Sequence, residues 1–179
     1  MMHSCLSGEL VDLEPLSAEH VSDAYVNWFN DPEVTRYNSH GEQVMTRAMV
    51  EEYVARVANS ETDAVFAMRA KDGAHVGNIS LQKIDPKNNN AEYAIILGDK
   101  QYWGRGIAGE ASQLLLAWGF EELGLHRIYC GTSVKNEPMQ KLAAQLGFIK
   151  EGVRKEAMRK RGEFVDIIEY GLLRKDFSS

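Results

Sequence analysis

The sequence predicts an α/β protein with a central mixed sheet of six to seven strands flanked by helices. Two observations indicate this class. Apolar residues recur with helical spacing near the beginning and in the middle of the chain, and β-rich runs lie between and after these segments. Three consecutive strands predict an antiparallel meander, whereas the later strand–helix–strand order predicts parallel neighbours. One sheet is therefore expected to contain both kinds of pairing, with helices covering it.

Two helices are expected before the first strand. Ser17 is placed to cap a helix that runs to about Asn30, where Asp31-Pro32 would stop it. Thr46 is placed to cap the second helix. The second helix carries one apolar stripe with i, i+3, i+4, i+7 spacing, formed by Val50, Tyr53, Val54 and Val57. Such a stripe must be buried, so this helix should pack against the sheet.

Three β-rich runs form the expected meander. Residues 64–70 and 75–84 are joined through Asp72-Gly73, a dipeptide typical of hairpin turns. The asparagines at 88–90 predict another turn, after which residues 91–97 form the third strand.

The second half of the chain alternates helices and strands. A long helix with a regular apolar stripe begins near Ile107 and can be closed by Gly124. Strands are expected at residues 126–132 and 164–173, with a helix from Glu137 to Leu146 between them. The connection through the long helix should be right-handed, so that the strands before and after it are parallel.

Composition and length predict one domain covering residues 1–179. The chain has no internal repeat and only four prolines. Its formal net charge of −6 argues against binding to the phosphate backbone of nucleic acids. Two cysteines are too few for a disulfide framework, and no stretch approaches the ~20 apolar residues of a membrane span. Without a charged-then-apolar leader, the expected location is the cytoplasm, with no nucleic-acid or membrane partner.

The most informative segment is the glycine-rich turn at residues 101–109, before the long helix. Glycine permits positive φ and lets backbone N–H groups approach a ligand closely. The start of the helix adds free donors and the positive end of the helix dipole. Such a turn is suited to binding phosphate. Gly104, Gly106 and Gly109 formally satisfy the dinucleotide fingerprint G-x-G-x-x-G.

Two known phosphate-binding loops nevertheless do not fit this turn. A dinucleotide loop follows its strand directly, whereas six residues, Gly98 to Trp103, intervene here. That loop also requires an acidic residue roughly 20 positions further on, where residues 131–135 read Gly-Thr-Ser-Val-Lys. A nucleoside-triphosphate loop requires G-K-[ST], which is absent. A purely structural glycine turn is the remaining alternative.

Four short motifs follow one another along the chain. The first and last are Trp28-x-Asn30-Asp31-Pro32-Glu33-Val34 and Gly162-Glu163-Phe164-x-Asp166. Between them lie Gln101-x-x-Gly104-x-Gly106-x-Ala108 and the segment from Asn136 to Gly147-Phe148. In this order they resemble the GNAT superfamily of N-acetyltransferases over nearly the whole chain. The glycine motif is similar to that superfamily's pyrophosphate signature, Q/R-x-x-G-x-G/A, and the outer motifs are typical of its ribosomal-protein, polyamine and amino-sugar acetyltransferases.

The resemblance implies a GNAT-like acyl-CoA N-acyltransferase fold and an acetyl-CoA-dependent N-acetyltransferase that acetylates a primary amine directly. The backbone of Ile95, Ile96 and Leu97 would receive the pantetheine arm, where this strand separates from the next. The remaining cofactor-binding residues implied for the pyrophosphate and the pantetheine amides are Trp103, Gly104, Arg105, Gly106, Ile107, Ala108 and Asn136. Acetyl-CoA is thus the expected co-substrate. No metal is expected, because the histidines lack ligand spacing.

The acceptor should be selected by residues that end and follow the first helix. By analogy with the family, the acceptor cleft would be lined by Trp28, Asn30, Arg36 and Tyr37. This set of aromatic, amide and basic groups suits a protein N-terminus, a polyamine or an amino sugar. The expected partner is therefore a small-molecule amine or a protein N-terminus, and a homo-oligomer is left open.

Glu92 is the candidate general base. Strand alternation places its side chain on the same face as Ala94 and Ile96. A lysine-like amine with a pKa of ~10.4 must lose a proton before it attacks, and a carboxylate at this place is suited to take it directly or through water. The alternative is a carboxylate that binds substrate or has a purely structural partner.

No side chain is assigned to protonate the departing thiolate. In this superfamily a tyrosine in the Asn…Gly-Phe helix often does so, but the alignment places Ala143 there. Some relatives use a hydroxyl four residues into that motif, where Met139 stands. Tyr129 is a substitute candidate, although a core tyrosine is the simpler interpretation. The missing tyrosine keeps a second function open, a non-catalytic acyl-CoA-binding regulatory module.

Overall fold

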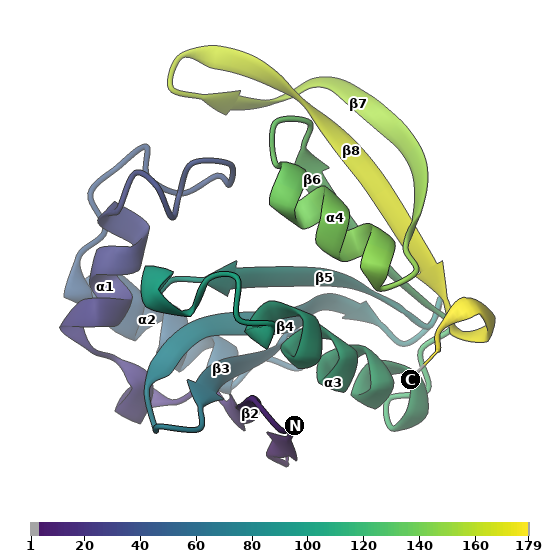
Figure 1. Ribbon diagram of the computed structural model, residues 1–179, viewed down its shortest axis with the longest axis horizontal. Coiled ribbons are helices and arrows are strands. Elements are labelled where there is room, and N and C mark those ends of the chain that lie inside the picture. Colours follow the sequence, from purple (N-terminus) through teal and green to yellow (C-terminus); the bar gives the residue numbers. More distant parts are fainter. Residues whose placement is uncertain (1–3, 179) are drawn as a thin grey trace.

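The computed structural model describes residues 4–178, and within them the chain forms eight strands and four α-helices (Figure 1). The strands are β1 (Leu6–Ser7), β2 (Val11–Pro15), β3 (Ala64–Ala70), β4 (His75–Asp85), β5 (Asn90–Leu97), β6 (Arg127–Ser133), β7 (Ile149–Lys160) and β8 (Glu163–Leu173). The helices are α1 (Asp23–Asn30), α2 (Arg47–Ala58), α3 (Ile107–Glu121) and α4 (Glu137–Gln145). Short 3-10 turns occur at Ala18–His20, Lys100–Tyr102 and Arg174–Asp176.

All eight strands belong to one sheet, in the order β1-β2-β3-β4-β5-β6-β8-β7. Only β5 and β6 are parallel, and every other neighbouring pair is antiparallel. The predicted mixed sheet is therefore confirmed, but the predicted number of six to seven strands is wrong. The strands that the periodicity did not reveal are β1, which has two residues, β2, which has five residues, and β7, which is almost entirely exposed and so lacks alternation.

The structure has two separate elements where the sequence predicted one first helix. Ser17 begins only a 3-10 turn, and α1 starts at Asp23 with Ser22 as its cap. The two elements are separated because the backbone of Val21 is extended. Thr46 caps α2, as predicted.

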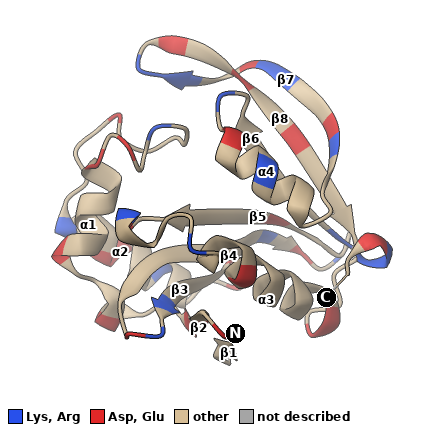
Figure 2. Ribbon diagram, viewed as in Figure 1, with Lys and Arg blue, Asp and Glu red and all other residues tan. Residues whose placement is uncertain are grey.

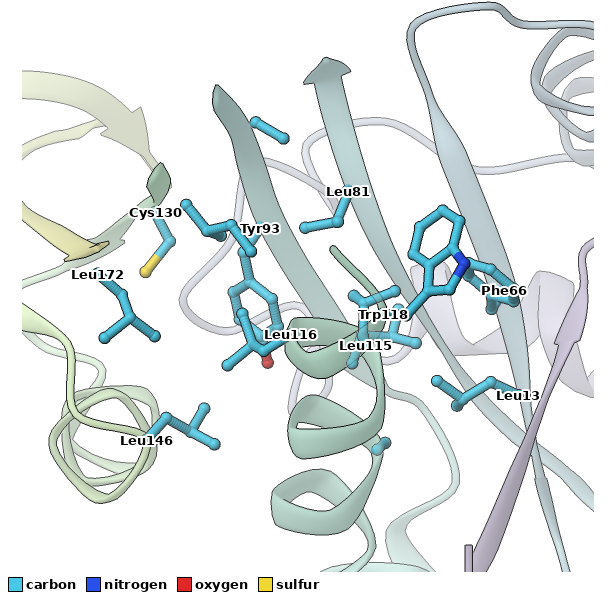
Figure 3. Packing of buried hydrophobic residues seen from close by; sticks show 14 of the residues in the cluster. Leu13, Phe66, Leu81, Tyr93, Leu115, Leu116, Trp118, Cys130, Leu146 and Leu172 are labelled. Atoms are coloured by element: carbon cyan, nitrogen blue, oxygen red, sulfur yellow. The ribbon is translucent and has the colours of Figure 1, made fainter. Parts of the chain in front are cut away.

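Helices cover both faces of the sheet. Adjacent residues of β3 belong to two different hydrophobic clusters, because successive side chains in a strand point to opposite faces. Phe66 and Met68 pack in the cluster that contains α3 and α4, whereas Val65 and Ala67 pack in the cluster that contains α1 and α2. Figure 3 shows the first cluster, with Leu115 of α3 and its neighbours between the helix and the sheet.

The parallel pair is short. β5 and β6 are paired only from Asn90 opposite Arg127 to Glu92 opposite Tyr129, although β5 continues to Leu97. Beyond these three pairs the two strands diverge, which leaves one edge of β5 without a strand partner. The separation predicted at residues 95–97 is present.

Gly98 lets α1 pack closely against the end of β5. A Cβ added at Gly98 would lie 2.1 Å from Cδ2 of the buried Trp28 indole. Gly98→Ala should therefore lower the free energy of unfolding by about 1–3 kcal/mol, as overpacking does. Urea unfolding measures this change. The control is Gly109→Ala, where a Cβ meets nothing within 4 Å and helix propensity predicts a gain of about 0.5–1 kcal/mol. Equal losses at both glycines would contradict the packing argument.

Candidate active site

A cavity of about 790 Å³ lies beside the point where β5 and β6 diverge. It is lined by residues of α1, α2, the segment between these helices, the central strands, and the hairpin formed by β7 and β8. A cavity of this size is typical of a small-molecule site.

One face of β4 supplies polar groups to this cavity. Asn78, Ser80 and Gln82 line it and alternate with buried apolar residues that face α3. The Gln82 side chain donates from Nε2 to Ser80 Oγ at 2.9 Å. Sequence reasoning missed this row, although polar residues at i, i+2 and i+4 that alternate with Ile79 and Leu81 were a visible signal.

Glu92 lines the cavity from β5, on the face that strand alternation predicts. It lies beside Gln82 of β4 and Tyr129 of β6. Its carboxylate pairs with Lys83 Nζ at 2.6 Å, and its side chain is 29% exposed. The hydrogen bond and charge of Glu92 raise the pKa of the Lys83 ammonium. The carboxylate is thus held by a cation while it stays open to water.

A second carboxylate, Glu169 of β8, lines the same cavity. It pairs with Arg154 Nε at 2.5 Å and lies opposite Gly131 of β6. A Cβ at Gly131 would be only 3.1 Å from Glu169 Oε1, so the glycine makes room for this carboxylate. Burial is the main cause that raises the pKa of Tyr129, and the negative charges of Glu92 and Glu169 raise it further. The sequence motifs do not include Glu169.

The glycine-rich turn leaves the start of α3 open. Gly104 and Gly106 have φ values of 73° and 81°, in the left-handed region that favours glycine. Gly106 is the residue before α3, and no side chain among the described residues caps the helix there. Ile107 is buried and Ala108 is half-buried, so backbone N–H groups are the donors available at these positions. The exposed Arg105 places a positive charge beside them.

The other predicted cofactor-binding residues follow the open edge of β5. Ile95 and Ile96 line the cavity. Trp103 ties the turn to the strand, because its indole Nε1 donates to the Leu97 carbonyl oxygen at 2.8 Å. Asn136 also lines the cavity, and its side chain caps α4 and donates to a threonine hydroxyl of β6. Asn136 therefore also serves as the cap of α4.

The hairpin of β7 and β8 is fastened to the segment between α1 and α2. Lys160, buried at the end of β7, donates to the His40 carbonyl oxygen and lies 3.6 Å from the Glu42 carboxylate. Arg161 donates to the Pro32 carbonyl oxygen at 2.9 Å. Figure 2 shows the basic residues at this hairpin tip. Burial and the Lys160 charge lower the pKa of His40, which lines the cavity.

A family model described as an acetyltransferase (GNAT) domain matches residues 11–149 of this chain. The chain belongs to the GNAT acetyltransferase family. It is 28% identical over 160 residues to the uncharacterized N-acetyltransferase p20 of Bacillus licheniformis, covering 88% of this chain and 89% of that protein. It is also 33% identical over 81 residues to spermidine N(1)-acetyltransferase of Escherichia coli (strain K12), covering 45% of this chain and 43% of that protein.

The fold agrees with this assignment. The structure of this GNAT chain is similar to that of spermidine N-acetyltransferase from Vibrio cholerae in complex with CoA and spermine, with a TM-score of 0.85 and 21% identity. The match covers 94% of this chain and 98% of that chain. The protein is therefore an N-acetyltransferase, an enzyme that transfers an acetyl group to an amine. A non-catalytic acyl-CoA-binding module is not favoured.

The predicted acceptor-contact residues of this GNAT enzyme are dispersed. Tyr37 lines the cavity. Trp28 is a buried residue of α1, and Asn30 exchanges hydrogen bonds of 2.8 and 2.9 Å with the Met45 backbone. The Arg36 guanidinium lies 5.1 Å from the centre of the Tyr37 ring. Contact of these four residues with an acceptor stays a prediction.

The two helix positions that could carry a hydroxyl in GNAT relatives differ in their surroundings. Ala143 is 0% exposed and lies in the core, whereas Met139 lines the cavity. Neither side chain can donate a proton to a thiolate. The structure therefore gives α4 no side-chain acid at these positions.

Residues 4–178 contain neither a metal-binding group of side chains nor a helix that could span a membrane. No group of three or more His, Cys, Asp or Glu side chains in that range is placed to hold a metal ion. No helix in the same range is long and apolar enough to cross a membrane.

Proposed function

We propose that this GNAT enzyme transfers the acetyl group of acetyl-CoA directly to a primary amine bound in the cavity. The observation that carries the proposal is the divergence of β5 from β6 after three residue pairs, beside the cavity and close to the uncapped start of α3. The Vibrio cholerae protein of the same fold is described as a complex with CoA, which supports acetyl-CoA as the acetyl donor.

The open edge of β5 suits the pantetheine arm of acetyl-CoA. An unpaired strand edge presents alternating N–H and C=O groups, and the two amides of pantetheine require partners of both kinds. Residues 95–97 form this edge where β6 has turned away, although the Leu97 carbonyl oxygen already accepts from Trp103. A backbone N–H at the same edge is also suited to stabilise the oxyanion that forms when the thioester carbon is attacked.

The turn before α3 suits the pyrophosphate of the co-substrate. Free N–H groups at the helix start and the positive end of the helix dipole both favour an anion. The positive φ values of Gly104 and Gly106 leave no side chain between these donors and a ligand. Arg105 adds a guanidinium that can pair with a phosphate oxygen.

Glu92 acts as the general base in this proposal, through water because its carboxylate is also held by Lys83. The amine nitrogen forms a bond to the thioester carbon and loses a proton toward Glu92, and the carbon–sulfur bond then breaks. The thiolate leaves and takes a proton from water. How much a general base helps depends on the pKa of the acceptor amine. A pKa of ~10.4 lies roughly 3 units above neutral pH, whereas the pKa of an α-amino group lies about 1 unit or less above it.

The test is the release of free thiol from acetyl-CoA in the presence of an amine panel. The panel contains polyamines, amino-sugar nucleotides and peptides with free N-termini. We expect amine-dependent thiol release and an acetylated product, identified by mass spectrometry, with at least one class. Tight CoA binding without turnover on every class would contradict the proposal.

A further inference from the structure

The hydroxyl of Tyr25 is fully buried in the cavity wall beside the Asn78 side chain, and no described residue is placed to accept its hydrogen. Tyr25 is 0% exposed, and its ring packs against the rings of Trp28, Phe29 and His75. A buried polar group without a partner destabilises the protein unless a bound group satisfies it. Because Tyr25 is one of the residues that line the cavity, its partner can come from a ligand there.

The amide of Asn78, next to this hydroxyl, has a fixed orientation. His75 Nε2 lies 3.0 Å from the Gly77 carbonyl oxygen and 2.9 Å from the Asn78 side chain. A carbonyl oxygen only accepts, so Nε2 must carry a hydrogen, and a nitrogen that carries its hydrogen cannot accept from an amide NH₂. The Asn78 atom that faces His75 is therefore Oδ1. Its NH₂ group is turned away from His75, toward Tyr25 and the cavity that both residues line.

Ser80, two residues after Asn78 in β4, also has a hydrogen to donate. Ser80 Oγ accepts from Gln82 Nε2, so its own hydrogen is available to a ligand. Tyr25, Asn78 and Ser80 all line the cavity, and together they offer hydroxyl and amide hydrogens. These three side chains are the donor row of the cavity.

The donor row lies next to the backbone that faces the proposed thioester. Asn78 is paired with Ile96, and Ser80 is paired with Ala94. Neighbouring strands are about 5 Å apart. When an amine attacks a thioester bound along β5, the substituent on the carbon next to the amine nitrogen would therefore lie over the donor row.

We propose that Tyr25 and Asn78 form a subsite for a carbonyl or carboxylate oxygen that the acceptor carries on the carbon next to its amine. This inference rests on the proposed function, because the acceptor must enter this cavity. It names the acceptor as an α-amino acyl compound, of the kind found at a peptide N-terminus. A polyamine has only donors to offer the row, and Glu92 and Glu169 on the cavity wall already have cationic partners, Lys83 and Arg154.

The experiment compares Tyr25→Phe with wild type on two probes, alaninamide and isopropylamine, which share an amine skeleton but differ in the carbonyl group. Wild type should prefer alaninamide. In the variant, kcat/KM for alaninamide should fall roughly 3- to 10-fold, the effect of one neutral hydrogen bond, whereas kcat/KM for isopropylamine should not change. The different basicity of the amines cancels, because each probe is compared with itself. The Tm of the unliganded variant should equal or exceed that of wild type.

Two further variants complete the test. Asn78→Asp replaces the donor by an acceptor while keeping the shape, so it should also lose activity selectively on alaninamide. Tyr170→Phe removes a hydroxyl from the core of β8, away from the cavity, and should leave the preference for alaninamide unchanged.

Three results would overturn this inference. They are equal losses on both probes in Tyr25→Phe, equal wild-type activity on both probes, and a lower Tm of Tyr25→Phe with an unchanged preference, which would indicate a buried water as the partner. Failure of the proposed function looks different, since wild type would then acetylate no amine in the panel.

Discussion

Gly104→Val should raise the Kd for acetyl-CoA at least about 100-fold, or about 2.7 kcal/mol, while the protein remains folded. The φ of 73° at Gly104 is unfavourable for a β-branched residue, so the turn must distort. A Cβ at this position meets no protein atom within 4 Å, so it projects into the space where a phosphate would approach the turn. Titration calorimetry measures the binding, and circular dichroism verifies the fold.

Gly124→Val is the matched control for this variant. Gly124 has a φ of 68°, and a Cβ there also meets nothing within 4 Å, but it lies beyond the other end of α3. Backbone strain should therefore be similar at the two sites, and only Gly104→Val should lose binding. A wild-type Kd in Gly104→Val, or the same loss in both variants, would show that the turn does not hold the pyrophosphate.

Glu92→Gln should reduce kcat by about 10²- to 10³-fold with little change in acetyl-CoA affinity. Glutamine preserves the shape of the side chain but cannot accept the proton of the amine. The difference in kcat between the variant and wild type should narrow as pH rises, because the fraction of unprotonated amine grows and less help from a general base is needed. Steady-state rates between pH 6 and 10 measure this trend. A constant rate ratio between variant and wild type over this range would remove Glu92 from the role of base.

Glu169→Gln tests whether the loss of a negative charge in the cavity is enough to explain the lower kcat expected of Glu92→Gln. Glu169 lines the same cavity from β8 and pairs with Arg154, as Glu92 pairs with Lys83. We expect a loss of less than about tenfold, since the proposed proton acceptor is still present. Equal losses in the two variants would indicate that both carboxylates act by attracting a cationic acceptor.

Local signals in the sequence predicted most of the elements around the site. The Asp72-Gly73 turn, the Thr46 cap and the start of the long helix at Ile107 agree with the structure. Such features depend on a few neighbouring residues, so a single sequence contains them. The helix predicted from Ser17 fails for a related reason, because Ser22 is a second cap only five residues later and the local pattern does not decide between them.

The sequence by itself determined the glycine turn and the face on which Glu92 lies, because positive φ and the two-residue period of a strand are set locally. Only the tertiary structure decided which side chains line the cavity. Trp28 is buried by contact with Gly98, 70 positions away, and Lys160 reaches His40 across 120 positions. The physical reason is that the order of strands in the sheet and the packing of α1 bring these residues together, and no local pattern of residues encodes such contacts.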